Sequence, residues 1–158
     1  MNKYTEKKSV GFDFDGVIHK NVNMADSFGQ RHPNIPFNSN PFLKFDKIID
    51  LIKIYYKYDY NIYIITARTS NYKSIVRQTL NNFGINENII STDNLIFTGD
   101  IGGDKVDILD RLNINDFYDD SPKIFKSILI GKKRNLLKKL TNCYITKPEI
   151  NKILKINL

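Results

Sequence analysis

Cysteine and tryptophan are nearly missing from this sequence. Its 158 residues include one cysteine, Cys143, and no tryptophan. A single cysteine excludes an internal disulfide and a metal site built from several thiolates, as is common in proteins of a reducing compartment. We expect Cys143 to be buried as a small apolar side chain.

Long apolar runs are missing as well. No run approaches the roughly 18 residues that a membrane-spanning helix needs, and the apolar stretch after the polar N-terminus is interrupted by Asp13, unlike the core of a signal peptide. We therefore expect an intracellular, cytoplasmic protein with no membrane partner. The composition, 41% hydrophobic and 26% charged, is globular. The length favours a single domain over residues 1–158.

Acidic residues are scarce at the C-terminal end. The net charge is +7 overall, and residues 123–158 carry ten basic side chains against one acidic one, Glu149, so the rest of the chain is slightly acidic. This basic segment is expected to complete the fold. Two interpretations of its charge stay open, contact with nucleic acid and a solvated face that reflects the lysine-rich codon usage of an AT-rich genome.

The order of strand and helix patterns predicts the fold class. Strand-like apolar runs cover 10–12, 62–65, 95–97, 117–118 and 143–146. Helical periodicity covers 42–56, 72–83, 105–112 and the residues after Pro122, with further helical stretches at 136–140 and after Pro148. This alternation predicts an α/β protein, a three-layer α/β/α Rossmann-like domain around a mainly parallel five-stranded sheet. Residues 17–41, which include three prolines, are expected to form a loop or flap.

Polar side chains follow several of these strands directly. Asp13 and Asp15 follow the first strand, Thr66 the second, and Asp119 and Asp120 the fourth, and Lys105 comes from the loop after the third. The carboxyl ends of parallel strands meet at one edge, where such folds bind ligands. Clustered carboxylates need a cation, and an all-oxygen site favours Mg²⁺. Lysine and threonine there would bind phosphate, so the sequence predicts phosphoryl chemistry.

Four segments, taken in order, resemble the motifs of the haloacid dehalogenase-like (HAD) hydrolase superfamily. They are Asp13-Phe14-Asp15-Gly16-Val17, Thr66, Lys105 and Asp119-Asp120, and the resemblance extends from Val10 to about Ile128. Single motifs of this kind are common by chance, but four in the expected order are specific. The amino-acid sequence around these motifs is most similar to that of small nucleotidase-like and polynucleotide 3′-phosphatase-like members.

The resemblance implies a role for each motif residue. Asp13 would be the nucleophile that forms an aspartyl-phosphate, and Asp15 the general acid/base. Thr66 and Lys105 would bind the phosphate. Mg²⁺ would be held by Asp13, Asp15, Asp119 and Asp120, with the backbone carbonyl of Asp15 as one ligand. Because the second motif carboxylate is an aspartate, the resemblance implies a phosphatase rather than a dehalogenase.

The spacing of the motifs leaves no room for a large cap domain, so the site is expected to be open. An open site accepts a nucleotide, a nucleic-acid end or a small metabolite. The candidates for substrate contact are His19, Arg31 and His32 in the flap, and Arg68 after the second motif.

Several alternatives stay open. The same carboxylates would suit a metal-dependent nuclease that activates water, or a non-catalytic phospho-receiver or nucleic-acid binding module. Lys123, close behind the acidic pair, competes with Lys105 for the phosphate-binding role, and either Asp119 or Asp120 is the principal metal ligand.

Overall fold

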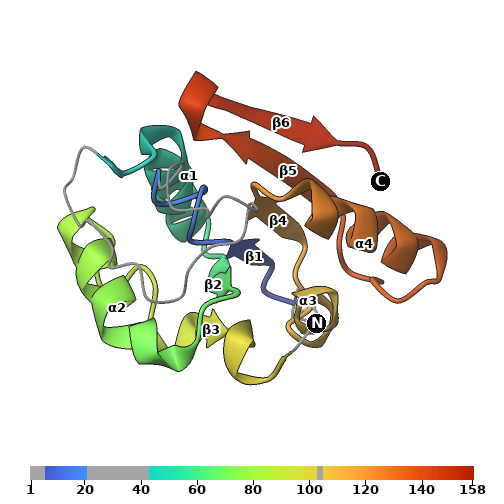
Figure 1. The fold of residues 1–158 in the computed structure, drawn as a ribbon, viewed down its shortest axis with the longest axis horizontal. Helices are drawn as coiled ribbons and strands as arrows, with labels where there is room; N and C mark the ends of the chain where they lie inside the picture. Colours follow the sequence, from blue (N-terminus) through green and yellow to red (C-terminus); the bar gives the residue numbers. More distant parts are fainter. Residues whose placement is uncertain (1–5, 21–42, 103–104) are drawn as a thin grey trace, which may run out of the picture.

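The computed structural model describes residues 6–20, 43–102 and 105–158 as an α/β fold around one sheet (Figure 1). The strands are β1 Ser9–Phe12, β2 Asn61–Thr66, β3 Leu95–Phe97, β4 Asp116–Asp119, β5 Asn142–Lys147 and β6 Lys152–Ile156. The α-helices are α1 Asp46–Lys57, α2 Lys73–Asn82, α3 Lys105–Arg111 and α4 Pro122–Lys133. The strands are arranged in the order β3-β2-β1-β4-β5-β6, which puts β1 near the middle of the sheet.

The sheet is mixed and six-stranded, so the prediction of five strands was wrong by one. The neighbours from β3 to β5 are parallel, and β6 pairs antiparallel with β5. A short 3₁₀ turn at Pro148–Ile150 and Asn151, whose φ is 54°, reverse the chain between these two strands. Asparagine is one of the few residues that adopt this left-handed conformation readily. The segment after Pro148 is therefore a hairpin strand and not the expected helix.

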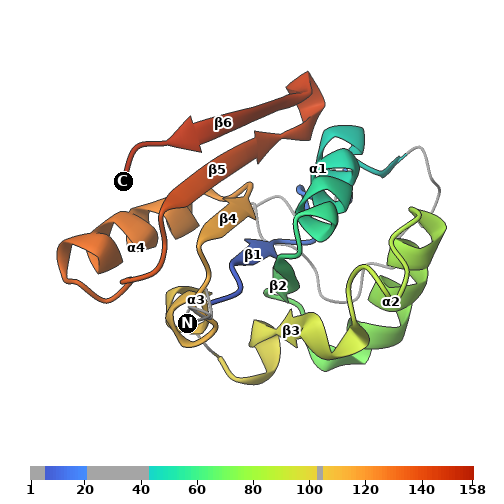
Figure 2. The ribbon, with the colours of Figure 1, turned by 180° about the vertical axis from the view of Figure 1, so that it is seen from behind.

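Two hydrophobic clusters hold the helices against the sheet. Strand residues alternate between its faces, so Val10 and Phe12 join the cluster that contains α1 and α2. Ile65 and Phe117 instead join the cluster that contains α3 and α4. Figures 1 and 2 show α1 and α2 on one side of the row of strands, and α3 and α4 on the other.

Several local expectations are confirmed and others are not. Pro122 is the first residue of α4, and Cys143 is buried in the second cluster. Residues 136–140 are irregular, so the helix expected there was wrong. Helix α1 begins at Asp46, and residues 21–41 of the expected flap lie outside the described residues. In the described part of the chain, no helix is long and apolar enough to cross a membrane.

Candidate phosphate and metal site

The pairing of the central strands brings the motif residues to one edge of the sheet. Phe12 of β1 pairs with Ile64 of β2 and with Tyr118 of β4. Asp13 follows Phe12, Thr66 ends β2, and Asp119 follows Tyr118, so the three side chains lie at the same strand ends. All three are buried. The backbone N–H of Asp13 also donates to the carbonyl of Tyr118 at 2.9 Å, which continues the β1–β4 pairing into the site.

Lys105 joins this group from the first residue of α3. Its Nζ lies 3.1 Å from Oδ1 of Asp13 and 2.9 Å from Oδ2 of Asp119, and all three side chains are almost entirely shielded from solvent. Burial disfavours the charged ammonium, but the two carboxylates outweigh burial and raise the pKa of Lys105 above its ordinary value. The two carboxylates therefore favour the charged form of Lys105. Lys123, the competing residue, is exposed at the start of α4.

Three carboxylates of the site lie close enough to share one metal ion. Asp13, Asp119 and Asp120 each offer an oxygen, and these oxygens lie within 4.8 Å of one another. Three ionised carboxylates against the one ammonium of Lys105 leave two negative charges, which a divalent cation would balance. The donor set is entirely oxygen, as Mg²⁺ prefers. The residues present therefore fit a magnesium ion.

Asp15 is turned toward a different cation, Arg68. Arg68 donates from Nε to Oδ2 of Asp15 at 2.7 Å and from Nη2 to Oδ1 at 2.9 Å, and both side chains are buried. The guanidinium carbon of Arg68 also lies 4.7 Å from the centre of the Tyr72 ring. This two-point contact fixes the orientation of the Asp15 carboxylate. Arg68, expected from the sequence to contact substrate, thus contacts the residue proposed as acid/base.

The turn that carries Thr66 and Arg68 is held by the loop after β3. The hydroxyl of Thr66 accepts from the backbone N–H of Arg68 at 3.2 Å, and the hydroxyl of Thr98 donates to the carbonyl of Thr66 at 3.0 Å. The N–H of Gly99 donates to the carbonyl of Arg68 at 3.2 Å. A Cβ at Gly99 would lie only 2.5 Å from the carbonyl oxygen of Ala67. Glycine is therefore required for this close approach.

Thr98 and Gly99 were not among the candidates from the sequence. They act on the site indirectly, by hydrogen bonding to the backbone carbonyls of Thr66 and Arg68. The sequence signal for this contact is weak, because a threonine-glycine pair directly after an apolar strand is common in loops.

The loop after β1 is fixed by its own backbone and by β5. Gly16 has a φ of 76°, its N–H donates to the carbonyl of His19 at 2.8 Å, and its carbonyl accepts from the hydroxyl of Thr146 at 2.9 Å. The N–H of Phe14 donates to Oδ1 of Asp13 at 2.8 Å. The bond from Thr146 links the first motif to β5, and the other two fix the loop locally.

Of the substrate contacts expected in the flap, the structure describes His19 alone. His19 is buried, with its ring about 6 Å from the rings of Phe14 and Phe83, so it forms part of the packing beneath the loop. Arg31 and His32 lie outside the described residues.

Comparison with known proteins adds one relative. The chain is 38% identical over 148 residues to the uncharacterized protein L684 of Acanthamoeba polyphaga mimivirus. The match covers 92% of this chain and 28% of the viral protein, so the chain spans less than a third of that relative's length. No family model matches the chain. The resemblance to the HAD superfamily therefore depends on the four motifs alone.

Proposed function

We propose that this chain is a Mg²⁺-dependent phosphomonoester hydrolase of the HAD type, built on the three-layer Rossmann-like arrangement of that superfamily. The observation that carries the proposal is the position of the Lys105 ammonium between the carboxylates of Asp13 and Asp119. These residues come from three separate motifs. Their contact supports the assignment of all three motifs to one site, and a buried cation beside a carboxylate nucleophile suits an incoming phosphate.

Asp13 is the nucleophile in this proposal. One of its carboxylate oxygens attacks the phosphorus atom, the new O–P bond forms, and the bond from phosphorus to the leaving-group oxygen breaks. Water then attacks the phosphorus of the aspartyl-phosphate, which releases inorganic phosphate and restores the Asp13 carboxylate. Lys105 and the Thr66 hydroxyl bind the phosphate oxygens during both steps.

Asp15 moves the protons. It gives a proton to the leaving oxygen, which departs as an alcohol, and takes one from the attacking water in the second step. Both of its oxygens accept hydrogen bonds from Arg68 in this structure. That contact suits the ionised carboxylate of the second step. Delivery of a proton in the first step requires one of the two bonds to Arg68 to be released.

The magnesium ion would be held by Asp13, Asp119 and Asp120, whose oxygens lie close together, and by the backbone carbonyl that the resemblance implies for Asp15. A bound Mg²⁺ supplies positive charge to the phosphate oxygens and to the carboxylates around them. The side chain of Asp15 is engaged with Arg68 and is not in this group.

We infer the substrate class from the sequence of the motifs and from the open site that is expected without a large cap domain. Nucleotides and nucleic-acid 3′-phosphate ends are the proposed substrates, with a small phosphorylated metabolite as the remaining choice. A metal-dependent nuclease, a phospho-receiver and a nucleic-acid binding module use similar residues, so the experiment has to separate all of these from a phosphatase.

The experiment is a phosphate-release assay with Mg²⁺ on nucleotides, 3′-phosphorylated oligonucleotides and a generic phosphomonoester. We expect release by the wild type and none above background by Asp13→Asn, which keeps the shape of the side chain and removes the nucleophile. Asp110→Asn, at an exposed position of α3, is the matched control and should retain full activity. Undiminished turnover by Asp13→Asn would contradict the mechanism. Cleavage of internal phosphodiesters without phosphate release would indicate the nuclease, and Mg²⁺ and phosphate binding without turnover the receiver.

A further inference from the structure

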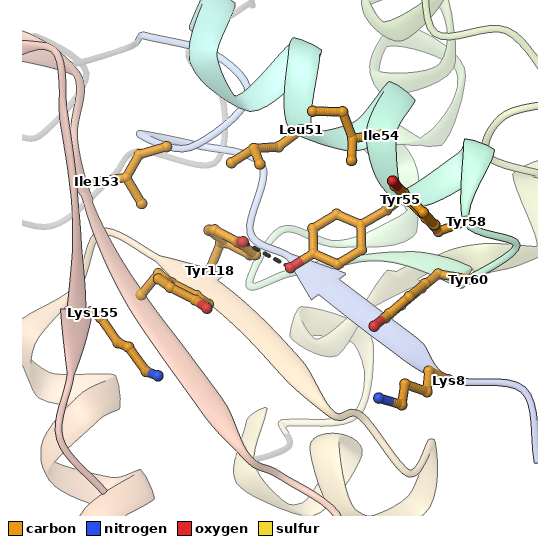
Figure 3. A pocket seen from close by; sticks show the side chains of 10 residues that line it. Lys8, Leu51, Ile54, Tyr55, Tyr58, Tyr60, Tyr118, Ile153 and Lys155 are labelled. Carbon is orange, nitrogen blue, oxygen red and sulfur yellow. Dashed lines mark hydrogen bonds between the residues drawn. The ribbon is translucent and has the colours of Figure 1, made fainter.

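An open groove of about 750 Å³ lies on the α1 side of the sheet (Figure 3), and no residue of the strand-end site lines it. Its floor is formed by β4, β5 and β6, and one wall by α1 and the residues that follow it. Ten side chains line the groove, and five of them are tyrosines. They are Lys8, Leu51, Ile54, Tyr55, Tyr58, Tyr60, Tyr118, Tyr144, Ile153 and Lys155.

A row of stacked rings crosses the sheet and ends in this groove. Phe12 of β1 stacks on Tyr118 of β4 with ring centres 4.7 Å apart, and Tyr118 stacks on Tyr144 of β5 at 4.5 Å. Strand pairing explains the row, since Phe12 is in register with Tyr118, and Tyr118 with Tyr144. Phe12 and Tyr118 are buried, whereas Tyr144 is half-buried. Tyr144 is therefore the ring of this row that is most accessible from the groove.

A second set of tyrosines stands across the groove. The Tyr55 hydroxyl lies 2.8 Å from that of Tyr118 and donates to Oδ2 of Asp116 at 3.3 Å. The Tyr55 and Tyr60 rings meet edge to face, with their centres 4.8 Å apart. Figure 3 shows these two rings on the wall facing Tyr118. Because the hydrogen bonds and ring contacts hold Tyr55 in place, the groove is preformed rather than a gap between loose side chains.

Both charged side chains that line the groove are lysines, and the one carboxylate described at it, that of buried Asp116, accepts hydrogen bonds from Tyr55 and Asn142. Lys155 follows the aromatic row on β6, in register with Tyr144, and Lys8 precedes β1 on the opposite wall. Figure 3 shows the two amino groups at the same end of the groove, one on each side. None of the ten lining residues is acidic, and among the described residues neither lysine forms an ion pair. The groove therefore fits an anion that also carries flat apolar surfaces.

The geometry points to a binding site for single-stranded nucleic acid in this groove. Unpaired bases stack on tyrosine rings whatever their sequence, and the phosphates beside them bind lysine. A duplex would keep its bases stacked on each other and away from the rings. A proline-rich peptide also suits aromatic grooves, but it offers nothing to Lys8 and Lys155. The inference is independent of the phosphatase, because no residue of the strand-end site lines the groove.

The first test is fluorescence anisotropy with a labelled oligothymidylate of about twelve nucleotides, titrated with the full chain at several salt concentrations. We expect Tyr144→Leu, which keeps an apolar strand residue but removes the ring, to weaken binding by about fivefold or more. Tyr58→Ser, at a side chain that is 69% exposed, changes a lining residue without risk to the core and should also weaken binding. Lys155→Gln should make the slope of the logarithm of the association constant against the logarithm of the salt concentration less negative by about 0.7.

Matched controls come from the same elements. Tyr56→Ser alters a tyrosine of α1 that is 49% exposed and does not line the groove. Lys152→Gln removes an exposed charge of β6 that also lies outside the groove. Both should bind the oligonucleotide as the wild type does.

Three results would overturn the inference. One is no anisotropy change at low salt, and another is equal loss of affinity in the lining and control variants. The third is a dimer in sedimentation velocity that Tyr58→Ser dissociates, since a second copy would then occupy the groove. Loss of phosphatase activity has no bearing on these results, so the two proposals fail separately.

Discussion

Lys105 places one ammonium group between two carboxylates that are shielded from water. A buried charge left without its partner is strongly destabilising, because desolvation is then not compensated. Asp13 and Asp119 are 4% and 0% exposed, so solvent cannot take over the role of Lys105. The residue thus serves the stability of the free protein as well as the proposed binding of phosphate.

We expect Lys105→Met to lower the free energy of unfolding by about 3 kcal/mol or more in the presence of a chelator. Added Mg²⁺ should recover part of this loss and should stabilise the variant more than the wild type, since the ion would then be the only cation among three carboxylates. Urea denaturation with and without Mg²⁺ measures both effects. Lys123→Met, at an exposed site of α4, is the control. Equal stabilisation of variant and wild type by Mg²⁺ would exclude a shared metal and lysine site.

Arg68 is the second cation of the site, and its contact depends on the shape of the guanidinium group. Lysine cannot donate two parallel hydrogen bonds to one carboxylate. We therefore expect Arg68→Lys to reduce kcat by about 10-fold to 100-fold, because Asp15 loses its fixed orientation. The KM for a small phosphomonoester should change little. Steady-state kinetics measure this split, and Arg111→Lys, whose side chain is 67% exposed, is the control. A rise in KM with kcat unchanged would instead place Arg68 on the substrate.

The candidate site could be predicted from the sequence as a set of residues but not as a set of contacts. The order of the motifs identifies Asp13, Thr66 and Asp119, because strand ends meet at one edge. The order of the motifs does not show that the Arg68 side chain contacts Asp15, because the direction of that side chain depends on the conformation of the turn after β2. His19 is a candidate for substrate contact from the sequence, and the structure adds that its ring lies near Phe83, which no spacing in the chain reveals.

At the scale of elements, the loop after β3 supports the turn after β2. Gly99→Ala would place a methyl group 2.5 Å from the Ala67 carbonyl oxygen. The nearest atoms are all backbone atoms of Ala67 and Arg68, which cannot rotate away as a flexible side chain could. We expect a loss of about 1–3 kcal/mol in stability and a fall in kcat/KM larger than the loss of folded protein explains. Chemical denaturation and kinetics on the same preparation separate the two effects.

Gly102→Asn is the control for that substitution. Gly102 has a φ of 55° and no atom within 4 Å of a built Cβ, so asparagine adds a side chain in open space at a conformation it tolerates. Activity close to the wild type is expected. If Gly99→Ala were equally harmless, the close approach of the two loops would not matter for the site.

The helices and strands that could be predicted are those with a clear period. Helix α1 buries Ile48, Ile49 and Ile52 on one side, and β2 carries a run of isoleucines. Strand β6 was missed because it lies at the edge of the sheet and is mostly exposed, so it lacks the continuous apolar run of a buried strand. Its pairing is set by β5 and by the turn at Asn151, neither of which is visible in its own residues.

At the scale of the whole molecule, the basic C-terminal segment is not a separate tail. It forms α4, β5 and β6, so its lysines are distributed over both faces of the sheet and along one helix. Of the basic residues in this segment, Lys155 alone lines the groove between α1 and β4–β6. Net charge therefore says little about nucleic acid here. The position of Lys155 beside the row of stacked rings is the more specific argument for nucleic-acid binding.

At alkaline pH, the stability of the whole fold depends on one thiol and several phenol groups that are neutral when protonated and are shielded from solvent to different extents. Burial raises the pKa of Cys143 from 9.0 to about 12, and burial also raises the pKa values of Tyr55, Tyr118 and Tyr144 above 10.0. In the unfolded chain these groups lose their protons at lower pH than in the folded chain. Between pH 9 and 12 the unfolded state therefore binds fewer protons, and the free energy of unfolding falls as pH rises.

We expect the stability from these groups to be fully present below pH 9 and to decline above it. Urea denaturation at intervals from pH 7 to 11 measures the decline. Cys143→Ala removes one of the shifted groups, so its unfolding free energy should fall less steeply above pH 9 than that of the wild type, even though the variant is less stable at pH 7. Parallel slopes for the two proteins would mean that the thiol ionises as easily in the fold as in the unfolded chain. Such a result would contradict its burial in the second cluster, and with it the packing of β5 against α3 and α4.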